Sequence, residues 1–185
     1  RLRLDQARRL MDDGAYADAL AMLKFVTEHA SDRETRESAY SRIYTCNIGL
    51  RRYDAAEEAL MAMHEQFPSR SDYVDKRADL LVHRGRIAQA LSFLKDEAAN
   101  ADDEFLRYQY ISNYEDIATP YIKDLMANGA TKKAYEASME LLSLYPASER
   151  GLQYAVNTSA QLGYWSDFDR RLCRRHIARK SLLYQ

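Results

Sequence analysis

Hydrophobic residues in this chain recur every three or four positions over short stretches, and the stretches come in pairs separated by a turn. Val74, Ala78 and Leu81 have this spacing before one turn, and Ala90 and Leu94 have it after that turn. Because an α-helix completes a turn in about 3.6 residues, this spacing places the apolar side chains on one face. The pattern predicts pairs of amphipathic helices joined by short turns.

The turn between paired helices follows a pattern that recurs five times, at turn residues that are 37, 34, 44 and 34 positions apart: Gly14, Arg51, Gly85, Gly129 and Gly163. Glycine ends a helix well because it adopts left-handed backbone angles without a Cβ penalty. The fifth position after the turn is small in four cases out of five, which lets two helices approach closely: Ala19, Ala56, Ala90, Ala134 and Phe168.

One such helix pair buries too little apolar surface to fold alone, so we expect neighbouring pairs to stack. The spacing predicts five units, at about residues 1–34, 37–70, 71–102, 103–148 and 149–185. We expect these units to form a single repeat domain over residues 1–185. Because the chain begins at Arg1, we interpret it as a piece of a longer protein.

Several motifs of the chain resemble the tetratricopeptide repeat (TPR) family. They are the Gly-x-Tyr-x-x-Ala pattern of residues 14–19, the Tyr-Asp-Ala-Ala run of residues 53–56, and the closing prolines Pro68 and Pro146. The resemblance covers essentially the whole chain. It implies an all-α fold, a right-handed superhelical α-solenoid of antiparallel helix pairs.

The chain departs from the family pattern at four positions. Arg51 stands where a turn glycine is usual, and Phe168 stands where a small residue is usual. Tyr44 and Ile122 also occupy positions where the family favours small side chains.

The longest interval contains the segment 103–128, in which Pro120 interrupts a helical pattern. Either one long helix kinks at Pro120, or Thr119 caps a new helix that begins there. We expect the long, kinked helix. We interpret the tyrosines of this segment as packing residues, with an aromatic ledge for a partner as the alternative: Tyr108, Tyr110, Tyr114 and Tyr121.

In TPR proteins the first helices of successive units line a concave groove, so the resemblance implies a set of partner-binding positions. These positions are Arg8, Met11, Ser41, Thr45, Asp72, Asp75, Asp79, His83, Asp116, Lys123, Asn157 and Gln161. Asp72, Asp75 and Asp79 share one helical face and would attract a basic segment. The alternative is a solvated face on which Asp72 caps its helix.

A second charged feature lies near the end of the chain and consists of Arg170, Arg171, Arg174, Arg175, Arg179 and Lys180. These residues could form a secondary basic surface for phosphates or an anionic membrane. Alternatively, they complement the dipole of a helix. The pI near 6.5 argues against a dedicated nucleic-acid binder.

The composition fits a helical repeat, with 46% hydrophobic and 30% charged residues and only 6 Gly and 3 Pro. No stretch reaches the roughly 18 apolar residues of a membrane span. The four histidines fall in different units, and no phosphate loop or nucleophile elbow is present, so we expect no metal, cofactor or enzyme activity. Cys46 and Cys173 lie in separate units, and we expect unpaired, inert thiols.

The leading hypothesis is a non-catalytic scaffold that binds a peptide or helix of a protein partner, preferably basic, in its concave groove. The alternative is the repeat region of a larger enzyme or of an envelope or secretion machine, such as a glycosyltransferase or a polysaccharide export system. Self-association through exposed ends of the solenoid is a third hypothesis. We favour the cytoplasm, or the periplasm if a signal peptide was removed.

Overall fold

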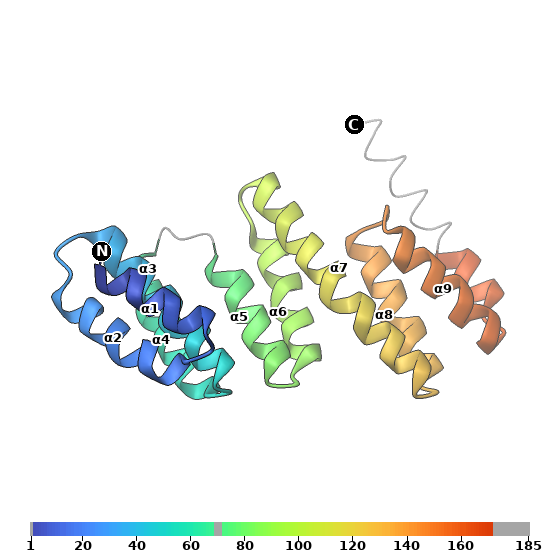
Figure 1. The fold of residues 1–185 in the computed structure, drawn as a ribbon. Helices are drawn as coiled ribbons and strands as arrows, with labels where there is room; N and C mark the ends of the chain where they lie inside the picture. The colour runs from blue at the N-terminus through green and yellow to red at the C-terminus, as the bar shows by residue number, and fades with distance from the viewer. Residues whose placement is uncertain (1, 69–71, 172–185) are drawn as a thin grey trace. The chain divides into compact units, whose positions relative to one another are not determined.

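The computed structural model describes residues 2–68 and 72–171 (Figure 1). The chain divides into two compact units, Arg1–Phe93 (unit 1) and Leu94–Gln185 (unit 2), and the division falls within α6. The helices are α1 (Leu2–Asp12), α2 (Tyr16–His29), α3 (Arg33–Gly49), α4 (Tyr53–Gln66), α5 (Tyr73–His83), α6 (Ile87–Asn100), α7 (Glu104–Ala127), α8 (Thr131–Leu144) and α9 (Glu149–Leu162).

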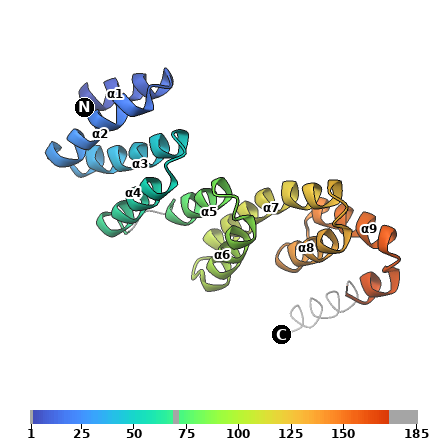
Figure 2. The same cartoon turned by 90° about the horizontal axis from the view of Figure 1, so that it is seen from below.

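Residues 165–171 are also helical, and the described ranges contain no strand. In unit 1 the helices α1 to α5 pack side by side in chain order, and in unit 2 the helices α7 to α9 do the same (Figure 2). The predicted all-α fold of antiparallel helix pairs is confirmed. Two helices begin within each of the last three expected sequence units. The boundary between the first two units lies a few residues too late, because α3 already begins at Arg33. The assignment of residues 1–185 to one domain stays a prediction.

All five turn residues adopt left-handed backbone angles, including the one that is not glycine. The φ angle is 55° at Arg51 and 70–76° at the four turn glycines. At Arg51, the N–H of Arg51 donates to the carbonyl of Ile48 at 2.9 Å, and the N–H of Arg52 donates to that of Asn47 at 2.8 Å. The same pair of bonds recurs at each glycine. This is the Schellman motif, which satisfies the last carbonyls of a helix and reverses the chain.

The small residues after the turns lie in the core. Ala19, Ala56, Ala90 and Ala134 are all fully buried. The bulky Phe168 is buried as well, and it packs with Tyr135 in the core of unit 2. The fold therefore accepts a phenyl ring at the last of these positions.

The helix α7 is continuous through Pro120, so the expected long helix is confirmed over Glu104–Ala127. Asp103 caps it, because its carboxylate accepts a hydrogen bond from the N–H of Phe105 at 2.9 Å. Four residues at four-residue spacing form its buried stripe: Tyr110, Tyr114, Ala118 and Ile122. Two of the four tyrosines of the alternative aromatic ledge are thus core residues, which leaves no continuous ledge.

Two hydrophobic residues that helical spacing or the turn pattern would place in the core lie at the surface. Leu152 is 43% exposed, although its neighbours in the pattern, Ala155 and Val156, pack in the core of unit 2. Trp165, in the position that Tyr16 and Tyr53 hold in the first two units, is 49% exposed. The adjacent residue Tyr164 packs instead, with its ring edge-on to that of Tyr135 at 5.5 Å. Both cases are shifts of one residue in the core register.

Candidate functional site: an acidic groove in unit 1

Two adjoining cavities open on the face of unit 1 that is formed by α1, α3 and α5. The first has a volume of about 530 Å³ and is lined by Met11, Glu34, Glu37, Ser38, Ser41, Arg42 and Thr45. The second has a volume of about 350 Å³ and is lined by Tyr44, Thr45, Ile48, Asp72, Asp75, Lys76 and Asp79. Because Thr45 lines both cavities, we treat them as one groove, called the unit 1 groove below.

The lining of the unit 1 groove follows from helix periodicity. On α3 the lining residues step by three or four positions from Glu34 to Ile48, so they share one face. Asp32 fixes the start of this helix, because its carboxylate accepts a hydrogen bond from the N–H of Thr35 at 2.7 Å. The lining residues of α5 have the same spacing, from Asp75 to Asp79.

The groove carries an excess of negative charge. Its lining holds two basic residues, Arg42 and Lys76, and five carboxylates: Glu34, Glu37, Asp72, Asp75 and Asp79. The Nζ atom of Lys76 lies 3.5 Å from the carboxylate of Asp72, and 5.3 Å from the centre of the Tyr44 ring. The positive charge of Lys76 is therefore partly balanced by Asp72 inside the groove.

Tyr44 forms the floor of the second cavity and ties two helices together. Its side chain is buried, and its hydroxyl donates a hydrogen bond to the backbone carbonyl of Lys76 at 2.8 Å. Burial raises the pKa of the Tyr44 phenol well above its usual value, and the charge of Asp79 adds to this shift. The phenol therefore stays protonated and keeps donating at any physiological pH.

Six of the residues expected at partner-binding positions line the groove: Met11, Ser41, Thr45, Asp72, Asp75 and Asp79. Two others from unit 1 lie outside it. Arg8 is exposed on α1. His83 is exposed at the end of α5, where its Nε2 lies 3.5 Å from the carboxylate of Asp79.

Asp72 stands at the N-cap position of α5, but its side chain makes no capping hydrogen bond. The alternative interpretation of Asp72 as a capping residue is therefore not supported by its geometry. Its carboxylate lies instead beside Lys76, within the groove lining.

Seven lining residues are not in the expected set of partner-binding positions: Glu34, Glu37, Ser38, Tyr44, Arg42, Ile48 and Lys76. The first three lie one or two helical turns before Ser41, so an extension of the expected stripe toward the start of α3 would have found them. Tyr44 was recognised only as a departure from the family pattern. Its role in the groove floor depends on contact with α5, which the sequence does not show.

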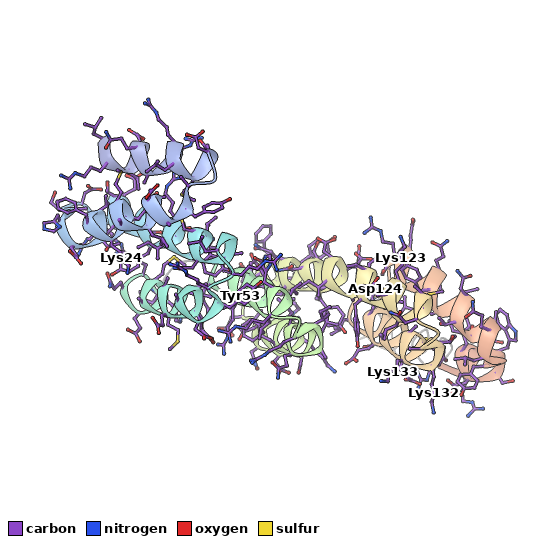
Figure 3. All side chains as sticks on the ribbon, turned by 60° about the horizontal axis from the view of Figure 1, so that its bottom comes forward. Lys24, Tyr53, Lys123, Asp124, Lys132 and Lys133 are labelled. Carbon is purple, nitrogen blue, oxygen red and sulfur yellow. The ribbon has the colours of Figure 1, made fainter. Side chains whose placement is uncertain are left out.

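In unit 2 the remaining expected positions lie on α7 and α9, which pack together. Asp116 and Lys123 on α7, and Asn157 and Gln161 on α9, are all exposed. Figure 3 shows Lys123 on the opposite side of unit 2 from Lys132 and Lys133 of α8.

Buried Ser148 fixes α9 against α7 in unit 2. Its hydroxyl accepts a hydrogen bond from the N–H of Gly151 at 2.9 Å, which caps α9. The same hydroxyl donates to the carboxylate of Glu115 on α7. Asn157 and Gln161 are therefore presented from a helix whose start is held in place.

The structure describes two residues of the predicted basic surface, and their surroundings differ. Arg170 is exposed, whereas Arg171 forms ion pairs with Glu136 and Asp167, both at 3.2 Å, and lies over the Tyr135 ring. The side chain of Arg171 thus contributes to the packing of unit 2. The other four residues of this surface, Arg174, Arg175, Arg179 and Lys180, lie outside the described residues, as does Cys173.

Other chemistry is sparse in the part of the chain that the structure describes. No group of three or more His, Cys, Asp and Glu side chains there is placed to hold a metal ion. None of the helices described is both long enough and apolar enough to span a membrane.

Cys46 on α3 is buried, and burial raises the pKa of its thiol to about 11. The positive charge of Arg42 partly offsets this rise.

Comparisons with known proteins support the helical-repeat fold. No family model matches the chain. A pentatricopeptide repeat-containing protein of Arabidopsis thaliana is 25% identical over 149 residues, which cover 78% of this chain and 28% of that protein. The chain thus spans less than a third of the length of this relative.

Among solved structures, the MamA RS-1 ArsTM double mutant aligns with a TM-score of 0.53 and 15% identity, over 100% of this chain and 96% of its own. TPR-like repeats of a putative Podospora anserina kinesin light chain align with a TM-score of 0.48 and 14% identity. This alignment covers 100% of this chain and 96% of the kinesin light chain structure. The first of these alignments supports a TPR-like helical-repeat fold for this chain.

Proposed function

We propose that this chain is a non-catalytic scaffold that binds a basic peptide segment of a protein partner in the unit 1 groove. The observation that carries this proposal is the charge of the groove lining, in which five carboxylates surround two cavities that contain two basic residues. A lysine or arginine side chain entering the groove would gain charge-assisted hydrogen bonds with these carboxylates. An anionic segment would meet repulsion.

The shape of the groove supports a peptide rather than a small molecule. The two cavities follow one another across three helices and are joined at Thr45, so a ligand that fills both must be extended. The apolar lining residues Met11, Tyr44 and Ile48 offer contacts for the aliphatic parts of such a segment. The exposed residues Asp116, Lys123, Asn157 and Gln161 of unit 2 extend the proposal to a second stretch of partner.

A panel of labelled peptides tests the proposed function. The panel contains a peptide with four lysine or arginine residues and matched peptides in which these are replaced by glutamine or glutamate. Fluorescence anisotropy with the full chain should show binding in the order basic, neutral, acidic. Equal affinities for the basic and acidic peptides would overturn the proposal.

Two variants with the same change in net charge locate the binding site. The groove variant carries Asp72→Asn, Asp75→Asn and Asp79→Asn. The control variant removes three exposed carboxylates from α2 and α4 of the same unit, through Asp18→Asn, Glu58→Gln and Glu65→Gln. Exposed ion pairs contribute about 0.2–1 kcal/mol each, so the groove variant should bind the basic peptide roughly tenfold more weakly than the control variant does.

A further inference from the structure

We infer that residues 172–185 of one copy of this chain bind in the unit 1 groove of a second copy, so that the protein associates with itself in a head-to-tail manner. This inference rests on the proposed function of the groove and names one occupant for it. We call residues 172–185 the basic segment.

The basic segment and the unit 1 groove carry complementary charges. The basic segment contains no acidic residue and four basic ones, namely Arg174, Arg175, Arg179 and Lys180. The unit 1 groove carries five carboxylates against two cations. Arg171, which precedes the segment, is already paired with Glu136 and Asp167. Those two carboxylates are therefore engaged with Arg171, and no acidic residue within the segment offsets its four positive charges.

The basic segment and the groove also both contain apolar residues. The basic residues of the segment are interleaved with Leu172, Ile177, Leu182 and Leu183. The groove lining contains Met11, Tyr44 and Ile48 beside its carboxylates. A segment with alternating basic and aliphatic side chains can therefore satisfy both kinds of lining residue, which a purely basic segment cannot do.

The length of the basic segment can be compared with the width of the groove. Packed helices lie about 8–10 Å apart, so a groove formed by three first helices is about 20 Å across. A fully extended chain spans about 3.3 Å per residue, which gives a segment of this length a reach of roughly 45 Å. The basic segment is thus long enough to cross both cavities.

The geometry of such a contact determines the kind of assembly. The groove lies in unit 1 and the basic segment belongs to unit 2, so two different surfaces meet. A contact between unlike surfaces leaves one groove and one segment unused after each association step. Further copies can therefore add, which produces rings or open chains rather than a closed two-fold dimer.

A complementation experiment with the full chain tests this inference. The segment variant carries Arg174→Gln, Arg175→Gln, Arg179→Gln and Lys180→Gln, and it keeps its groove. The groove variant keeps its segment. In sedimentation velocity at low salt, the native chain should grow in mass with concentration, and each variant alone should remain a monomer. An equimolar mixture should form a dimer and nothing larger, because only one groove and one segment remain intact in each pair.

Salt and the control variant complete the experiment. High salt should weaken association of the native chain by roughly tenfold or more, because screening acts on charged surfaces. The control variant should associate as the native chain does. A native chain that is monomeric at every concentration, a single variant that still associates, or a mixture that stays monomeric would each overturn the inference.

The peptide panel separates failure of this inference from failure of the proposed function. If the basic peptide binds the groove while the native chain stays monomeric, the groove serves a different basic partner and only the inference is wrong. If neither the peptide nor the basic segment binds, both are wrong. Far-UV circular dichroism of each variant shows whether it retains the native helix content.

Discussion

The hydroxyl of Tyr44 donates a hydrogen bond to the backbone carbonyl of Lys76 at 2.8 Å, and this bond joins α3 to α5 beneath the second cavity of the unit 1 groove. Both residues also line that cavity. Tyr44 occupies a position where the family pattern favours a small residue. The bulky side chain therefore gives this groove a floor and a cross-link between two first helices.

Replacing Tyr44 with phenylalanine removes this hydrogen bond and leaves the ring in place. A buried hydrogen bond contributes about 0.5–1.5 kcal/mol, so the free energy of unfolding should fall by about 1 kcal/mol. Tyr40→Phe is the matched control, because the Tyr40 hydroxyl accepts its bond from Gln66 at an exposed site. Urea denaturation should show a clearly larger loss for Tyr44→Phe, and equal losses would show that the cross-link does not stabilise the fold.

The turns offer a pair of substitutions with opposite expected signs. Arg51 has a φ of 55°, and a left-handed backbone costs a residue with a Cβ about 1–2 kcal/mol. Arg51→Gly should therefore stabilise the chain by about 0.5–1 kcal/mol, after the greater entropy of glycine in the unfolded state is subtracted.

Gly85→Ala should do the reverse. A Cβ at Gly85 would meet no atom within 4 Å, so any change reports the backbone conformation alone. We expect a loss of about 1 kcal/mol in chemical denaturation. If both substitutions change stability in the same direction, the left-handed assignment of Arg51 or Gly85 is wrong.

The close approach of paired helices predicts sensitivity to side-chain size at one face of α6. Ala90 is 0% exposed, whereas Ala88 on the same helix is exposed. Ala90→Leu should destabilise the chain by about 1–3 kcal/mol through overpacking. Ala88→Leu should change stability by less than about 0.5 kcal/mol. Thermal melts compare the two, and a tolerated leucine at Ala90 would contradict the packing described.

Alkaline pH should destabilise the fold beginning near pH 9. Burial raises the pKa of the Cys46 thiol from 9.0 to about 11, so its stabilising contribution is complete below pH 9 and is lost as the pH rises to 11. Burial also raises the pKa of Tyr135 to about 12, helped by its hydrogen bond to Asp167, which extends the loss of stability above pH 10.

The thiol contribution can be isolated by comparing slopes. Cys46→Ala should flatten the dependence of unfolding free energy on pH between 9 and 10, because in this range the thiol is exposed and deprotonates in the unfolded chain but stays protonated in the folded one. Guanidinium denaturation over a pH series measures these slopes. Identical slopes in the native chain and in Cys46→Ala would show that the buried thiol does not titrate with a raised pKa.

The sequence was enough to predict the turns and the helix pairs, because both depend on short-range rules. The left-handed turn at Arg51 could be placed only because its neighbours in the sequence matched those of the four glycine turns. The continuity of α7 through Pro120 was the expected one of two alternatives that the sequence left open. The exposure of Leu152 and Trp165 could not be predicted from the sequence. Which of two neighbouring residues faces the core depends there on tertiary packing.

The groove was partly predictable for the same reason. Asp72, Asp75 and Asp79 follow helical spacing, and the structure places them around one cavity. Glu34 and Glu37 belong to the first turns of α3, whose start depends on the Asp32 cap and not on an apolar pattern. The pairing of Lys76 with Asp72 could not be derived either, because it requires side-chain geometry.

The central claim is that the unit 1 groove binds basic segments through its carboxylates, and its most direct test is the salt dependence of affinity. The dissociation constant of the four-charge basic peptide should be measured by anisotropy over a salt series, for the native chain, the groove variant and the control variant. The native chain and the control variant should show a steep, matching loss of affinity with salt, while the groove variant binds weakly with a shallow slope. A groove variant whose affinity and slope match those of the native chain would contradict the claim.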